Sequence, residues 1–323
     1  MTLLRFSPVA LSRSRFAISP LAETVGCLVA LHRGRSEPWI APWVSRHAGG
    51  FRNWLASDEV AAGLVPMLGV RWLPDYVAIP PLDGVRTRLS DELAQVAAFA
   101  DEDIVTMTTD SSAPDLGRPA GDWLGQRGLG QRVAAMVEEG WARFVEPDWP
   151  RRRAVLERDI MYRAGQLAAF GWQQAISDMA RKFAWVGDDA IFFSNQDYPD
   201  RWISGEGLIF VPYTCGGGTW TCERPPNYAL VYPAWGVGAQ QQASATDPAA
   251  RLLGPGRARV LRELARPATS TQLATVLGLS LGTVSAHLAI LRESGVVAGA
   301  RSGRTVLYQL TPRGQSLLAL LDA

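Results

Sequence analysis

A glycine between two short amphipathic stretches is the feature that most constrains the fold of this chain. It lies in "ATSTQLATVLGLSLGTVSAHLAILRESG", residues 268–295. Thr269 and Gln272 have the spacing of a capping box, in which a threonine and a glutamine satisfy the first backbone N–H groups of a helix. The apolar positions Leu273, Val276 and Leu277 follow, and Gly278 comes directly after them. The pattern predicts a helix that begins after Thr269 and ends at Gly278.

A second helix is predicted immediately afterwards. Ser280 stands in the N-cap position, where its hydroxyl can accept a backbone N–H. Val284, Leu288 and Leu291 then recur at i, i+4 and i+7, which places them on one face, and Gly295 ends the pattern. The two helices are therefore separated by a short turn.

The flanking segments complete a recognisable order of elements. "RARVLRELA" (257–265) places Val260, Leu261 and Leu264 on one face of a preceding helix. "VVAGA" (296–300) and "TVLYQLT" (305–311) read as strands joined by "RSGR" (301–304), and a last helix begins at Pro312. This is the order of a winged helix-turn-helix. In that fold one helix enters the major groove of DNA, and basic side chains on the hairpin contact the phosphates. A small helical bundle with a hairpin is the alternative reading of the same pattern.

Residues 257–311 resemble the winged helix of ArsR-type bacterial repressors. The resemblance rests on "VLRELA", "STQLATVLGLSLGTVSAHLAILRESGVV" and "RSGRTVLYQL". It implies a cytoplasmic DNA-binding transcriptional regulator, a homodimeric repressor whose partner is double-stranded DNA. The candidate DNA-binding residues, on the recognition helix and the hairpin, are Ser280, Thr283, Ser285, His287, Arg292, Arg301 and Arg304.

The chain departs from the family pattern in two respects. Metal-sensing relatives often carry a cysteine pair on the helix before the turn, whereas "STQLATVL" has no thiol or imidazole. With three cysteines and three histidines in scattered positions, the sequence predicts no metal site and no cofactor. Leu281, Gly282 and Ala286 also lack hydrogen-bonding side chains on the expected reading face, which favours apolar contacts and DNA shape for part of the recognition.

Length and charge predict two domains. At 323 residues the chain exceeds one ordinary core. The stretch at 236–259, rich in Gly, Ala, Gln and Pro, indicates a linker at about 238–250, so we expect a domain at 1–240 and a DNA-binding domain at 241–323. Nine arginines stand against four acidic residues from position 241 onward, although the whole chain carries a net charge of only +1. That local excess favours a polyanionic partner.

The N-terminal domain is expected to be mixed, so the predicted fold class is α+β, with helices dominant and an antiparallel β meander over residues 189–234. "ISPLAETVGCL", "EPDWPRRRAVLERDI" and "ALVYPAWGVG" resemble the poorly characterised N-terminal region attached to such winged helices in actinobacterial regulators. All twelve tryptophans fall in this part. Core packing accounts for most of them. The alternative hypothesis is that a few of them line a pocket for a small hydrophobic or aromatic effector.

The sequence lacks the common catalytic signatures. There is no phosphate-binding Gly-rich loop followed by Lys-Ser/Thr, no G-x-S-x-G and no H-E-x-x-H. No apolar run approaches the roughly 20 residues that span a bilayer, and the N-terminus lacks a secretory signal. The expectation is a cytoplasmic regulator without catalytic residues. An enzyme with an appended DNA-binding module, and a protein-interaction module that uses the helix-turn-helix surface, are the alternatives.

Overall fold

The chain forms two compact units. The computed structural model describes residues 2–37, 39–69, 73–110, 122–176, 179, 184–187, 189–194, 199–216, 218–234, 248–302 and 305–321. Unit 1 comprises Met1–Trp149 and Arg163–Ala234, and unit 2 comprises Pro150–Tyr162 and Trp235–Ala323. The expected domain boundary at 240/241, and most of the expected linker, lie outside the described residues.

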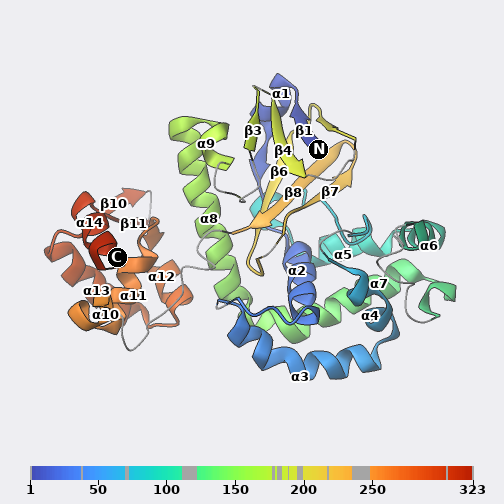
Figure 1. Ribbon diagram of the computed structural model, residues 1–323, viewed down its shortest axis with the longest axis horizontal. Coiled ribbons are helices and arrows are strands. Elements are labelled where there is room, and N and C mark those ends of the chain that lie inside the picture. The colour runs from blue at the N-terminus through green and yellow to red at the C-terminus, as the bar shows by residue number, and fades with distance from the viewer. Residues whose placement is uncertain are drawn as a thin grey trace. The chain divides into compact units, whose positions relative to one another are not determined.

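Unit 1 mixes helices with two four-stranded sheets (Figure 1). Its strands are β1 (Thr2–Phe6), β2 (Arg15–Phe16), β3 (Ala184–Val186), β4 (Ala190–Ser194), β5 (Arg201–Ile203), β6 (Leu208–Tyr213), β7 (Trp220–Arg224) and β8 (Asn227–Pro233). Its helices are α1 (Pro8–Arg13), α2 (Pro20–His32), α3 (Ala41–Ser57), α4 (Glu59–Leu64), α5 (Leu89–Ala97), α6 (Asp101–Asp110), α7 (Leu129–Gly140) and α9 (Trp172–Ile176). Helix α8 (Trp149–Phe170) contributes residues to both units.

The prediction of an antiparallel meander over 189–234 is wrong. The strands of this region are divided between a sheet ordered β3-β4-β1-β5 and a sheet ordered β2-β6-β8-β7. β6 pairs with β8 in parallel, whereas β7 pairs with β8, and β4 with the preceding β3, in antiparallel fashion. The N-terminal strands β1 and β2 pair with β4, β5 and β6, so strands from the start of the chain lie within or beside those of this region. Short runs rich in aliphatic and aromatic residues identify strands but do not encode which partner each strand takes.

β6 separates two hydrophobic cores, and every one of its six side chains is buried. Ile209, Val211 and Tyr213 face the larger core, which the helices α2, α3, α5 and α7 complete. Leu208 and Phe210 face a smaller core with residues from β1, β4 and β5. A strand buried on both faces reads as a continuous apolar run rather than an alternating one, and "LIFVPY" has that character.

Core packing accounts for most of the described tryptophans. Trp43, Trp54 and Trp123 are buried in the larger core, and Trp39, Trp141, Trp149 and Trp220 pack against it. Trp172 and Trp185 pack against the smaller core, whereas Trp202 is exposed. This distribution agrees with the packing role predicted from composition.

The start of α2 is held by a buried carboxyl group. Ser19 caps the helix, as the sequence predicts, by accepting the N–H of Ala22 at 2.9 Å. The same hydroxyl donates to Glu92 Oε1 at 2.5 Å, and the N–H of Leu21 donates to Glu92 Oε2 at 2.9 Å. Burial of Glu92 raises the pKa of its carboxyl to about 8, and the two hydrogen bonds only partly oppose that rise.

We expect Glu92 to make stability depend on pH. Its pKa is higher in the folded chain than the ordinary 4.5, so the folded state loses stability as the pH rises from about 4.5 through about 8. Glu92→Gln keeps the shape and the neutral state. The difference in free energy of unfolding between the variant and the wild type should therefore grow in the variant's favour by up to about 1.4 kcal/mol per pH unit in this window. Urea unfolding at a series of pH values measures it, and a constant difference would contradict the assignment.

Unit 2 is a small helical unit with a three-stranded sheet (Figure 1). Besides residues 150–162 of α8, it contains α10 (Pro248–Leu253), α11 (Pro255–Glu263), β9 (Ala268–Thr269), α12 (Ser270–Leu277), α13 (Leu281–Glu293), β10 (Val297–Ser302), β11 (Thr305–Leu310) and α14 (Pro312–Leu321). The predicted apolar faces of α11, α12 and α13 form its core together with Val296, Val297 and Leu310. The last helix begins at Pro312 as predicted and packs Leu317 and Leu318 against this core, whereas its Leu320 is 77% exposed.

In the described part of the chain, no single helix is long and apolar enough to cross a membrane. α12 and α13 reach that length and composition only when taken together, and they are bent by 118° relative to each other.

Two buried ion pairs join residues 150–162 to the end of α11 within unit 2. Arg158 Nη1 lies 2.5 Å from Glu263 Oε2, and both side chains are buried. Arg266 Nη1 lies 3.6 Å from Asp159 Oδ1, and the Arg266 guanidinium stacks over the ring of Tyr162 at 3.5 Å. The pairs are complementary, since one basic and one acidic partner come from each segment. A stretch from the middle of the sequence is thus a structural part of the C-terminal unit.

Removing one partner of a buried pair should be far more harmful than removing both. Arg158→Met leaves the Glu263 carboxylate buried without its closest cation, and we expect a loss of about 3–5 kcal/mol in the free energy of unfolding. Arg158→Met combined with Glu263→Leu should recover most of that loss. Urea unfolding followed by circular dichroism measures both variants. A single variant within about 1 kcal/mol of the wild type, an exposed-pair magnitude, would contradict the burial of this pair.

Candidate nucleic-acid interface

α12 is built as the sequence predicts. Thr269 Oγ1 accepts the N–H of Gln272 at 3.2 Å, and Gln272 Oε1 accepts the N–H of Thr269 at 2.9 Å, which completes the capping box. Gly278 ends the helix with φ +63°, in the left-handed region that favours glycine. The turn to α13 therefore consists of Gly278, Leu279 and Ser280. An angle of 118° between the two helices lies within the range typical of helix-turn-helix motifs.

The N-terminus of α13 is exposed and well capped. Ser280 Oγ accepts the N–H of Thr283 at 3.1 Å and lies 2.8 Å from Thr283 Oγ1. Both predicted contact residues are exposed at the helix start, where backbone N–H groups and the helix dipole favour anions. This end of α13 is suited to a phosphate or a base edge.

The outer face of α13 is mainly small and apolar, as expected. Ser285 is exposed, together with Leu281, Gly282 and Ala286. Ile290, on the same helix, is 45% exposed, and Leu281 is 52% exposed. Ser285 and Thr283 are accordingly the hydrogen-bonding side chains that the first two turns present to solvent.

His287 lies on the inner side of this face. Its imidazole is half-buried, and Nε2 would be 2.5 Å from a Cβ added to Gly256 in α11. The ring thus packs into space that a glycine leaves open, beside the core residues Val284 and Leu288. Sequence periodicity alone did not reveal this contact, because it depends on how α11 crosses α13.

The hairpin β10–β11 presents part of the predicted basic tip. The strands pair from Val297↔Leu310 to Ser302↔Thr305. Arg301 is exposed near the turn, and Arg292 is exposed in the last turn of α13. Arg304 lies outside the described residues.

The arginines of unit 2 differ in burial. Arg266 is buried in the ion pair with Asp159, whereas Arg259 is exposed and donates from Nη2 to the carbonyl of Leu277 at 2.8 Å. Arg251 and Arg313, which the sequence analysis did not single out, are exposed. Charge counting could locate the basic segment but could not separate Arg266 from the exposed arginines, because burial depends on residues 150–162.

Comparison with known proteins matches this segment to a family. Residues 252–300 match the model of the helix-turn-helix domain family. This part of the chain is a helix-turn-helix domain. The domain covers α11, α12 and α13 and most of β10, so it includes the capped turn and the exposed helix face described above.

A curated relative supports the same assignment. The chain is 33% identical over 79 residues to the HTH-type transcriptional regulator NmtR of Mycobacterium tuberculosis. The match covers 24% of this chain and 66% of the relative, just under two thirds of its length. No solved structure matched the chain. The similarity therefore concerns the C-terminal helix-turn-helix domain.

Proposed function

We propose that this protein is a cytoplasmic transcriptional regulator that binds double-stranded DNA through residues 241–323. The observation that carries the proposal is the family match over residues 252–300 together with the solvent-exposed N-terminal half of α13. In this proposal α13 is the recognition helix, and its first two turns enter the major groove. The similarity to a named HTH-type transcriptional regulator supports the regulatory role.

The chemistry of α13 favours modest base discrimination. Ser285 and Thr283 offer hydroxyls to base edges, while Leu281 and Ala286 suit thymine methyl groups. Since few side chains on this face can donate two hydrogen bonds, DNA shape and phosphate contacts carry much of the affinity. His287 remains a candidate, with its half-buried ring limiting how far it reaches.

The β10–β11 hairpin is proposed as the wing of a winged helix-turn-helix. Arg301 is exposed on it, and Arg304 comes three residues later in the sequence. Arginines on a hairpin next to a recognition helix are placed to contact phosphates, which contribute affinity without reading sequence.

Dimerisation is proposed through the surface of α10 and α14. These two helices contact each other, and each carries a strongly exposed leucine, Leu252 at 65% and Leu320 at 77%. A second copy would cover these side chains and place two recognition helices about 34 Å apart for successive major grooves. A homodimer of this kind is suited to repression at a two-fold symmetric operator.

Residues 1–240 are proposed as the regulatory part. Apart from residues 150–162, the described residues of this part belong to unit 1, which has two hydrophobic cores of its own, and this part of the sequence holds every tryptophan. We propose that this part senses a small hydrophobic or aromatic molecule or mediates assembly. The strongly perturbed carboxyl of Glu92 is used to hold the start of α2, which favours a structural over a catalytic role for it.

A protein-interaction role is the second candidate, because the exposed Leu281 and Ile290 would also suit a partner protein. Selection of genomic DNA fragments by the purified full-length protein at low salt separates the two. DNA binding predicts enrichment of a shared sequence. Failure to retain any fragment would contradict DNA binding and favour the protein partner.

The hairpin arginines should contribute to affinity for every DNA sequence. Arg301→Ala combined with Arg304→Ala should weaken binding uniformly and reduce the slope of log K against log salt by about 1.8, corresponding to two phosphate contacts. Fluorescence anisotropy at several salt concentrations measures this, with Arg52→Ala as a control, because Arg52 is exposed and lies on α3 of unit 1. An unchanged slope would remove the hairpin from the interface.

Substitution of Ser285 should change the base preference, whereas substitution of His287 should change the thermal stability. Ser285→Ala should alter the preferred base at one position by about 1 kcal/mol while leaving the melting temperature unchanged. His287→Ala should lower the melting temperature, because it empties the space against Gly256, and combined with Ser285→Ala it should change the selected site. If the double variant selects the same site as the wild type, direct readout by this face of α13 is wrong.

A further inference from the structure

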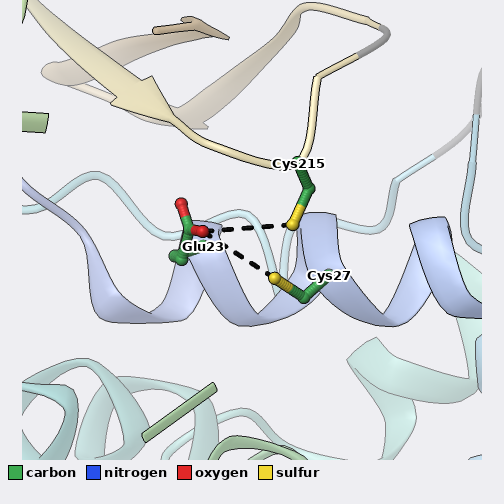
Figure 2. A group of neighbouring side chains, drawn as sticks. All are labelled: Glu23, Cys27 and Cys215. Carbon is green, nitrogen blue, oxygen red and sulfur yellow. Dashed lines mark hydrogen bonds between the residues drawn. The ribbon is translucent and has the colours of Figure 1, made fainter. Parts of the chain in front are cut away.

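Three potential metal ligands from distant parts of the sequence meet inside unit 1. Glu23 and Cys27 are one turn apart on α2, and Cys215 follows the end of β6 (Figure 2). All three side chains are buried, and one ligand atom from each lies within 4.8 Å of the other two. Sequence spacing gave no indication of this group, because Cys215 reaches α2 only through the sheet.

The fold brings α2 unusually close to this end of β6. A Cβ added at Gly26 would lie 2.7 Å from Tyr213 Cδ2, so only a glycine allows the helix to approach the strand at this point. After Cys215 the chain turns at Gly216, whose φ is +55°, and a Cβ there would lie 3.0 Å from the indole of Trp39. Two glycines thus fix the spacing between the helix and the cysteine.

The separations between the ligand atoms suit a tetrahedral ion. Cys27 Sγ lies 3.7 Å and Cys215 Sγ lies 3.9 Å from the same oxygen, Glu23 Oε1 (Figure 2). With Zn–S bonds of about 2.3 Å and Zn–O bonds of about 2.0–2.2 Å, tetrahedral ligands lie about 3.5 Å (S···O) and about 3.8 Å (S···S) apart. The two S···O separations are therefore within a few tenths of an ångström of the tetrahedral value, and the two sulfurs lie within 4.8 Å of each other.

Hydrogen bonds from Thr214 fix the orientation of the Glu23 carboxylate. Its Oε2 accepts the N–H of Thr214 at 2.8 Å, and its Oε1 accepts the hydroxyl of Thr214. Such supporting hydrogen bonds fix the direction of a metal-binding carboxylate. A thiol is a weak donor, so two thiols directed at one buried carboxylate oxygen form a poor hydrogen-bonding arrangement but a good set of donors once they lose their protons.

We propose that Glu23, Cys27 and Cys215 bind a thiophilic divalent cation of the Zn²⁺ type within unit 1. Two thiolates select for such ions over Mg²⁺ or Ca²⁺. The cation displaces the two thiol protons and compensates the buried negative charge. Three protein ligands leave one tetrahedral position for water or a small anion. The site is separate from the helix-turn-helix domain, and the inference does not depend on DNA binding.

The test is a titration of reduced, chelator-treated full-length protein with Cd²⁺. Bonds between Cd²⁺ and thiolates absorb in the ultraviolet, and we expect this absorption to saturate at one ion per chain. Cys27→Ser and Cys215→Ser should each weaken binding by more than about 100-fold, the upper range for loss of a supporting partner. Titration with Co²⁺ should give the intense visible bands of tetrahedral coordination.

Cys222→Ser is the matched control. Cys222 is also buried and also lies in unit 1, but it is not part of the group, so this variant should bind Cd²⁺ as the wild type does. Thr214→Val keeps all three ligands and should weaken binding by about 10–100-fold. Circular dichroism verifies that each variant is folded.

Absence of thiolate absorption in the folded wild-type protein at stoichiometric Cd²⁺ would overturn the proposal, whatever the variants do. Equal absorption in wild type and Cys27→Ser, or its loss in Cys222→Ser alone, would also overturn it, because the ion would then be bound elsewhere.

Discussion

Burial of β6 on both faces is the constraint on which unit 1 depends. Its alternate side chains enter two different cores, so the strand must lie between layers, and its pairing with β2 and β8 makes it an interior strand of its sheet. β8 pairs with it in parallel, and the alternating side chains Ala229 and Val231 face the larger core while Leu230 and Tyr232 face the smaller one. The position of Thr214 and Cys215 follows, since they come directly after this strand and meet α2 where Gly26 allows a close approach.

A comparable constraint shapes unit 2, but it is electrostatic. Arg158 with Glu263, and Asp159 with Arg266, bury four charged side chains in matched pairs. Charges removed from water require such partners, so residues 150–162 become part of the same unit as the helix-turn-helix domain. A fragment that begins at the expected boundary near residue 241 would lack Arg158 and Asp159. The charged groups of Glu263 and Arg266 would then lose their ion-pair partners.

Local features of the helix-turn-helix domain were predictable in detail. The capping box of Thr269 and Gln272, the left-handed Gly278 and the cap at Ser280 each depend on atoms within a few residues. The apolar faces were equally accessible, because helical periodicity alone selects Leu273, Val284 and Leu288 for the core. The strand pairing of unit 1 was predicted wrongly, since a run such as "GLIFVPYT" carries no information on whether its neighbour is parallel.

In the last quarter of the chain, the residue pattern alone locates the ends of the helices, their buried faces and the basic charge. The burial of Arg266, the packing of His287 against Gly256 and the convergence of Glu23, Cys27 and Cys215 become visible only in the folded chain. The difference lies in the distance along the chain over which each interaction acts. Caps, glycine conformations and periodicity act over a few residues, whereas burial of a charge or assembly of a ligand group depends on segments that only the folded sheets and helices bring together.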